Sequence, residues 1–229
     1  MKRTLKAMVA ITLIGISFVF LGCCGKSHSG KINGHAYVDL CLPSGTLWAT
    51  CNVGASAPED YGNYYSWGET ATKSTYNWVT YKYANGSFIQ LTKYCNDPRS
   101  GNEGFTDNLT TLQVGDDPAT ANWGGGWRTP TATQWNELMN YTTNNWMVKN
   151  GVKGRLFTSK KNGCSIFLPA AGFRWDNELR DIGDYGCYWS SSLDIGVLGN
   201  VEYFDFYPGG YRMHSDFDRV RGQSVRAVR

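Results

Sequence analysis

The spacing of turn-forming residues is the feature that most limits the fold of this chain. The sequence contains 27 glycines and 7 prolines, and from residue 35 onward turn residues separate short runs of alternating polar and apolar side chains. Because glycine and proline interrupt long helices and strands, this spacing predicts many short strands joined by turns and long loops. The runs with the clearest strand character are residues 46–53, 155–161, 164–169, 187–192, 201–207 and 223–228.

One predicted hairpin has a strong turn signal. Asn162-Gly163 is typical of a two-residue hairpin loop, and side chains of alternating chemistry flank it. The sequence therefore predicts a hairpin over residues 155–169 in which Ser159 lies opposite Ile166.

One helix is predicted, and it begins directly after Thr131. Gln134 follows Thr131 by three residues, which is the pattern of a capping box. A shorter turn of helix is expected over residues 117–122. The apolar face of the longer helix recurs at helical spacing through Trp135, Leu138, Met139 and Thr142.

The N-terminal segment has the pattern of a secretory signal. Basic residues begin the chain, and an apolar run over residues 7–22 follows them. A helix of that length spans about 24 Å, which is less than the roughly 30 Å hydrocarbon core of a membrane. A basic start followed by a short apolar run is typical of a signal peptide.

The end of this signal carries a further pattern. Phe20-Leu21-Gly22-Cys23 resembles the lipobox of bacterial lipoproteins. The resemblance implies that residues 1–22 are removed and that Cys23 carries acyl chains of the palmitate type. Two alternatives stay open, namely an ordinary signal peptide with incidental cysteines and lipidation at Cys24. We expect a protein anchored by its lipid in the cell envelope, at the outer membrane or the cell surface.

Removal of this signal leaves a chain without net charge. The signal holds three basic residues and no acidic one, so the 22 basic residues fall to 19 and equal the 19 acidic residues. Phosphate binding requires a cationic surplus, so we expect no nucleic-acid partner. The remaining length suits one domain, with a lipidated tether over residues 23–34 and the domain over residues 35–229.

Five more cysteines lie in the predicted domain. Exported domains form disulfides, and we expect the pairs Cys51–Cys95 and Cys164–Cys187. A hairpin expected around residues 43–45 would hold Cys41 and Cys51 about 10–13 Å apart, which is too far for a disulfide.

Several blocks of the sequence resemble the Fibrobacter-type major paralogous domain (FISUMP-like) of bacterial surface lipoproteins. These blocks are residues 37–40, 42–54, 64–69, 127–131, 167–172, 188–191 and 224–228, together with Trp135 and Leu138. Cys41 stands where that family usually has glycine. Residues 128–135 also resemble the Arg-x-Pro-Thr-x-x-x-Trp segment of formylglycine-generating-enzyme-like domains.

This resemblance implies a fold of the α+β class. The implied fold is a single C-type-lectin-like (formylglycine-generating-enzyme-like) domain with short twisted antiparallel strands, one or two short helices and long loops. We expect the tryptophans of these blocks in the core, namely Trp48, Trp67, Trp127, Trp135 and Trp189.

The sequence offers no recognised catalytic motif. The predicted mature chain has three histidines and lacks H-E-x-x-H, G-x-S-x-G and P-loop patterns. Oxidation of the formylglycine-generating kind needs a cysteine pair and copper, and Cys164 and Cys187 are the candidates for that alternative. Acidic and amide residues between 96 and 117 leave calcium open, although their spacing is not that of an EF-hand. We expect a non-catalytic protein without a cofactor or a metal.

The candidate binding site lies in two C-terminal loops, residues 173–185 and 207–212. Aromatic rings beside acidic, amide and basic groups suit a sugar or the edge of a protein, although such rings also commonly cover a core. The candidate residues are Trp175, Asp176, Tyr185, Tyr211 and Arg212. We therefore expect an extracytoplasmic binding protein that recognises a glycan or a protein partner, as an adhesin or a surface-assembly component.

Overall fold

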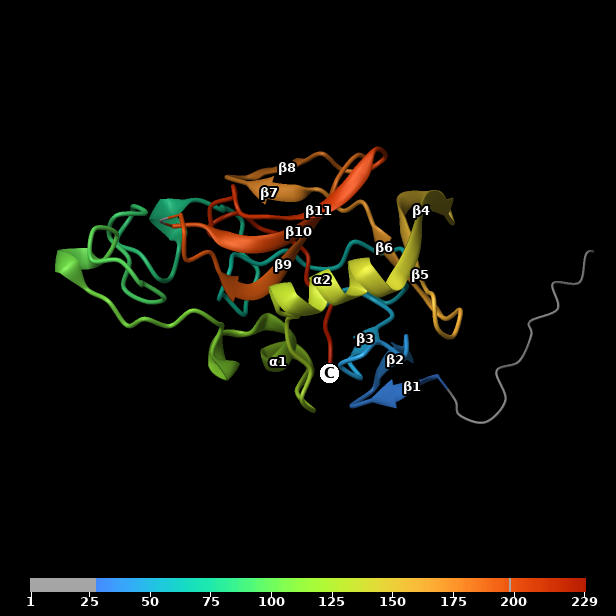
Figure 1. Ribbon diagram of the computed structural model, residues 1–229. Helices are drawn as coiled ribbons and strands as arrows, with labels where there is room; N and C mark the ends of the chain where they lie inside the picture. Colours follow the sequence, from blue (N-terminus) through green and yellow to red (C-terminus); the bar gives the residue numbers. More distant parts are fainter. Residues whose placement is uncertain (1–27, 198) are drawn as a thin grey trace, which may run out of the picture.

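The computed structural model describes residues 28–197 and 199–229, and within them the chain has an α+β architecture (Figure 1). The fold combines small antiparallel sheets with two α-helices, α1 (Pro118–Trp123) and α2 (Ala132–Tyr141). The predicted signal and the lipidation at Cys23 lie outside the described residues. No helix of the described ranges is long and apolar enough to cross a membrane.

The strands of the described chain are short, as the turn spacing predicts. They pair in the orders β1-β2-β3, β4-β5-β6, β11-β10-β9 and β7-β8. In chain order they are β1 (Ser29–Ile32), β2 (His35–Asp39), β3 (Leu47–Ala49), β4 (Thr142–Lys149), β5 (Val152–Ser159), β6 (Ser165–Pro169), β7 (Phe173–Trp175), β8 (Glu178–Arg180), β9 (Gly186–Leu193), β10 (Val201–Tyr207) and β11 (Gly210–His214).

The long segment between β3 and α1 forms the loop-rich end of the molecule, opposite β4, β5 and β6 (Figure 1). Its regular structure is limited to three short 3-10 helices, η1 (Trp78–Thr80), η2 (Asn102–Gly104) and η3 (Val114–Asp116).

Regular structure begins within the segment predicted as the tether. Strand β1 pairs with β2 from Ser29 opposite Val38 to Ile32 opposite His35. The sequence predicts that residues 29–32 belong to a short polar tether. In the structure they form an edge strand of the first sheet.

The predicted helix is confirmed as α2. The Thr131 side chain accepts the backbone N–H of Gln134, and the Gln134 side chain accepts that of Thr131, so the capping box is complete. Trp135 is fully buried and stacks on Phe204 of β10 with 4.6 Å between ring centroids. Helix α2 therefore packs its apolar face against the β11-β10-β9 sheet (Figure 1).

The expected core tryptophans are confirmed, and buried arginines hold the loops around them. Trp48, Trp67, Trp127, Trp135 and Trp189 are at most 1% exposed.

The buried guanidinium of Arg226 donates to the carbonyl oxygens of Ala49, Thr50 and Phe167 at 2.6–3.1 Å. Residues 223–228, predicted as a strand, instead make isolated bridges to several loops. Side-chain bonds to the backbone thus replace long strands as the framework of this region.

The hairpin over residues 155–169 forms with a register that differs from the prediction. Phe157 lies opposite Ile166, whereas the sequence predicted Ser159 in that place. The Ser159 hydroxyl accepts the backbone N–H of Lys161 and its carbonyl accepts that of Gly163, so residues 160–163 form a longer turn. A shift of two residues keeps each side chain on its predicted face of the sheet.

Candidate functional site

A polar hollow with a volume of about 540 Å³ lies between residues 62–76 and the β7–β8 hairpin. Amide, hydroxyl and cationic side chains converge on it above two tyrosine rings. Its lining residues are Gly62, Asn63, Tyr64, Thr72, Lys73, Ser74, Tyr76, Arg174 and Asn177.

The turn of the β7–β8 hairpin is fixed against the opposite wall by Asp176. Asp176 has a φ of 50°, a left-handed conformation that Asp adopts more readily than most residues and that suits a two-residue hairpin turn. Its backbone pairs with that of Tyr76 through bonds of 2.8 and 3.0 Å. Its carboxylate accepts the Asn77 amide at 2.8 Å. These bonds position Arg174 and Asn177 across the hollow from residues 63–74.

Two buried tyrosines form the floor of the hollow. The Tyr64 hydroxyl donates to the carbonyl oxygen of Ala171 at 2.6 Å, and the Tyr76 hydroxyl donates to that of Tyr64 at 2.8 Å. Burial raises the pKa of both phenols, so they stay neutral. Because both hydroxyls are bound inside the protein and both rings are buried, the floor is rigid and the polar side chains around it are the groups left to contact a ligand.

The two cations of the hollow differ in their partners. The Lys73 ammonium lies 2.9 Å from the Glu69 carboxylate. Burial lowers the pKa of Lys73, and Glu69 offsets only part of that effect. The Arg174 guanidinium lies over the Tyr64 ring, 5.5 Å from its centroid. No carboxylate of the described residues lies within 4.0 Å of Arg174, so its charge is available to a ligand.

The predicted site residues Trp175 and Asp176 belong to this hairpin but do not line the hollow. The half-buried Trp175 ring packs under the guanidinium of Arg221, with 4.3 Å from Cζ to the ring centroid. Adjacent strand residues point to opposite faces, so Trp175 faces away from Arg174. Asp176 has the structural role of fixing the turn.

The other three predicted residues lie elsewhere. Tyr185 is 38% exposed and its ring centroid lies 5.4 Å from that of Tyr207. Tyr211 is half-buried and packs edge-on against Phe157 of the core. Arg212 is exposed and its guanidinium lies 3.4 Å from the buried carboxylate of Asp205.

The sheet separates Trp175 from Tyr211. Tyr203 and Phe204 are neighbours in β10 and point to opposite faces. Phe204 and Tyr211 pack on one face, whereas Phe217, which stacks on Tyr203, lies on the other. The Arg221 guanidinium packs on the rings of both Trp175 and Phe217, so Trp175 lies on the same face as Phe217. The structure therefore does not bring the predicted aromatic pair together.

The lining residues that the sequence analysis missed carry little local signal. Arg174 and Asn177 lie in the same loop as the predicted residues, and strand alternation is the signal that separates Arg174 from Trp175. Asn63 and Lys73 come near them through long-range contacts such as the pairing of Tyr76 with Asp176, a residue 100 positions further along the chain.

The predicted disulfides are not formed. Cys51 and Cys95 are separate thiols, and Cys187 is a thiol that is 2% exposed. Burial, followed by the charge of Asp205, raises the pKa of Cys187. The Cys95 sulfur contacts the carbonyl oxygen of Asp97 at 3.1 Å instead of Cys51. A buried, protonated Cys187 gives no support to the copper-dependent oxidoreductase alternative.

Three of the acidic residues between 96 and 117 are engaged by donors within the protein. The Asp107 carboxylate accepts the backbone N–H groups of Tyr94 and Cys95 at 2.8 and 2.9 Å. Asp117 caps α1, and Asp116 accepts a hydrogen bond from Lys93 at 2.5 Å. These three carboxylates therefore have structural roles.

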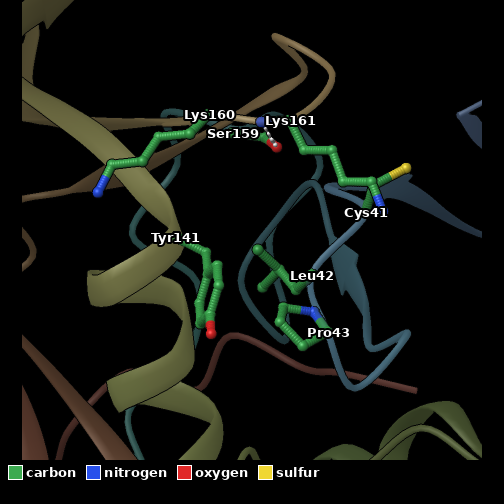
Figure 2. Close-up of a pocket in the computed structure, with 7 residues that line it drawn as sticks. All are labelled: Cys41, Leu42, Pro43, Tyr141, Ser159, Lys160 and Lys161. Carbon is green, nitrogen blue, oxygen red and sulfur yellow. Dashed lines mark hydrogen bonds between the residues drawn. The ribbon is translucent and has the colours of Figure 1, made fainter.

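A second hollow, with a volume of about 310 Å³, lies between the end of α2 and the loop after β2 (Figure 2). The side chains of Leu42, Pro43 and Tyr141 approach one another there, and Ser159 and Lys160 also line it. Few polar side chains converge in it, so the hollow beside Arg174 is the stronger candidate for specific recognition.

Comparison of the chain with protein-family models, with curated proteins and with solved structures finds no match. The resemblance of its sequence blocks to the Fibrobacter-type major paralogous domain therefore stays a prediction.

Proposed function

We propose that this protein is a lipid-anchored binding protein of the cell envelope that recognises an acidic glycan, without catalysis, through the hollow beside Arg174. The observation that carries the proposal is the convergence of amide, hydroxyl and cationic groups on one open hollow with a rigid floor. Sugars present many hydroxyls, and amide and hydroxyl side chains can both donate to and accept from them.

Arg174 indicates the chemical class of the ligand. A guanidinium binds a carboxylate through two parallel hydrogen bonds, and the charge of Arg174 has no carboxylate partner among the described residues. Asn63, Thr72 and Asn177 lie around it and suit the hydroxyls of the same sugar. A sugar that carries a carboxylate matches this set better than a neutral one.

The sequence supports the location and the fold. The lipobox-like Phe20-Leu21-Gly22-Cys23 supports a lipid anchor, and two or three acyl chains hold a protein stably where one does not. Small antiparallel sheets, two short α-helices and long loops support a C-type-lectin-like domain of the FISUMP-like kind.

A glycan array with full-length acylated protein in detergent tests the binding. We expect binding to carboxylated glycans, and Arg174→Ala should weaken it at least about tenfold because a charged hydrogen-bonded pair is lost. Arg180→Ala is the matched control, because Arg180 lies on the same hairpin, is half exposed and pairs with Glu178. Equal binding by the parent and Arg174→Ala would contradict the proposed site.

Cell binding separates the glycan from a protein partner. Binding that disappears after glycosidase treatment of the target cells supports the proposal. Binding that survives glycosidase and disappears after protease treatment would replace the glycan with a protein.

A further inference from the structure

We propose that His28, Asp39 and Cys41 form a binding site for a divalent transition metal of the Zn²⁺ type. The His28 Nδ1 atom lies 3.5 Å from the Cys41 sulfur and 3.8 Å from Oδ2 of Asp39. One ligand atom from each residue lies within 4.8 Å of the other two, and all three residues are half-buried. The site is separate from the hollow beside Arg174.

The donor set selects the class of metal. Thiolate sulfur, imidazole nitrogen and carboxylate oxygen together suit Zn²⁺, whereas Mg²⁺ and Ca²⁺ prefer oxygen ligands alone. In a tetrahedral Zn²⁺ site, a sulfur and a nitrogen ligand lie about 3.5 Å apart, since their bonds to the metal are about 2.3 and 2.0 Å long. The observed separation of the Cys41 sulfur and the His28 nitrogen equals that value. Three protein ligands leave the fourth position for water or another ligand.

The backbone at Cys41 is held in the conformation that places its sulfur at the cluster. Cys41 has a φ of 51°, in the left-handed region that favours glycine. Its N–H donates to Oδ1 of Asp39 at 2.7 Å, which fixes the carboxylate beside the sulfur. Cys41 also lines the second hollow, and Figure 2 shows its sulfur pointing away from Leu42, Pro43 and Tyr141.

A further side chain orients two of the ligands. The Asn162 amide lies 3.2 Å from the Cys41 sulfur and donates to the carbonyl oxygen of Asp39 at 2.8 Å. Hydrogen bonds of this kind around a metal site hold the ligands in place. The Asp39 N–H also donates to the carbonyl oxygen of His28 at 2.6 Å, so the three ligands share one backbone framework.

The geometry favours a metal over a catalytic triad. In a Cys-His-Asp triad the nucleophile and the acid contact different ring nitrogens of the histidine. Here the Cys41 sulfur and the Asp39 carboxylate both approach the same atom, Nδ1 of His28. Three potential ligand atoms that lie this close together suit a shared metal cation. Such a metal would tie the chain before β1 to the end of β2.

Metal titration of the full chain in detergent, under reducing conditions, tests the site. We expect one equivalent of Zn²⁺ to bind and to raise the melting temperature, because a ligand that binds only the folded state stabilises it. Co²⁺ should bind in the same place and give the absorption band of a sulfur–cobalt bond.

Variants of the ligands distinguish this site from other thiols. His28→Ala, Asp39→Asn and Cys41→Gly should each weaken Zn²⁺ binding about a hundredfold or more, since even outer-shell changes cost 10–100-fold. Cys41→Gly is the sharpest variant, because glycine suits the left-handed backbone and the metal-free protein should still fold. Cys51→Ser is the matched control, a half-buried thiol outside the cluster.

The result that supports the site is loss of Zn²⁺ binding and of the sulfur–cobalt band in Cys41→Gly, with the metal-free melting temperature kept. Absence of Zn²⁺ binding by the parent, unchanged affinity in Cys41→Gly, or an equal loss in Cys51→Ser would each overturn it.

Discussion

The Arg174 guanidinium lies over the ring of Tyr64, with 5.5 Å between Cζ and the ring centroid. This contact joins the β7–β8 hairpin to a loop more than 100 residues earlier in the chain. The contact also restrains the Arg174 side chain on a buried ring. This reduces the conformational entropy that the side chain loses when a ligand binds. The hollow is thus organised before any ligand binds.

The two predicted aromatic residues should respond differently to substitution. Tyr211→Ala should lower the free energy of unfolding by about 2–3 kcal/mol, because its ring packs against Phe157 in the core. Neither Tyr211→Ala nor Trp175→Ala should change glycan binding more than about threefold, because neither ring lines the hollow. Urea denaturation and the glycan assay measure the two effects. Loss of binding in either variant at unchanged stability would move the site toward the C-terminal loops.

The ends and the face of α2 give a second prediction. Thr131→Ala removes the side-chain oxygen of the capping box and should cost about 0.5–2 kcal/mol of stability. Trp135→Ala should cost about 3–5 kcal/mol, because that ring is fully buried. Denaturant unfolding compares the two variants, and equal small effects would be inconsistent with the packing of α2.

Asp116 should make the fold sensitive to acid. Burial opposes the charge of Asp116, but hydrogen bonds from Lys93, Tyr83 and Tyr94 outweigh burial and lower its pKa. A carboxyl whose pKa is lower in the folded state stabilises the protein above its unfolded pKa of about 3.9 and loses that effect as the pH falls through the folded value.

Asp116→Asn should therefore lower the free energy of unfolding by about 2–3 kcal/mol at neutral pH, and the difference from the parent should shrink below about pH 4. Asp184→Asn, at an exposed carboxylate, is the control with little effect at either pH. A difference that stays constant from pH 7 to pH 3 would show that the charge of Asp116 is not what stabilises the network.

The thiols should differ in accessibility. Alkylation of the native protein, followed by peptide mapping, should label Cys41 and Cys51 before the buried Cys95 and Cys187. A Cys51–Cys95 linked peptide in non-reducing maps of exported material would contradict the separate thiols of the structure and restore the first of the predicted disulfides.

The lipid anchor depends on a single residue. Cys23→Ser removes the only sulfur that the lipobox-like segment offers for acylation, so the protein should move from the detergent phase to the aqueous phase in a partitioning assay. Unchanged partitioning would point to Cys24 or to a protein without lipid.

Local features of this fold were predictable and long-range ones were not. The capping box of Thr131 and Gln134 depends on residues three positions apart, so the sequence locates α2. The predicted hairpin register was wrong because the Ser159 side chain accepts a hydrogen bond within the turn and lengthens it. The Asn-Gly signal does not reveal this bond. Loop composition placed Tyr211 on the surface, but its orientation depends on the packing of β11 against Phe157.

The candidate hollow could not be predicted because distant segments build it. Asn63, Lys73 and Arg174 have no shared sequence pattern, and the pairing of Tyr76 with Asp176 brings them together. The predicted residues Trp175 and Asp176 lie in the same hairpin as the hollow, since Arg174 and Asn177 flank them in the sequence.

The most direct test of the proposed function compares a carboxylated glycan with its methyl ester. Calorimetry with full-length protein should show that the parent binds the acid at least about tenfold more tightly than the ester, because only the acid forms a charged pair with Arg174. Arg174→Ala should bind both forms equally weakly, and Arg180→Ala should keep the preference of the parent. An undiminished preference for the acid in Arg174→Ala would contradict the account.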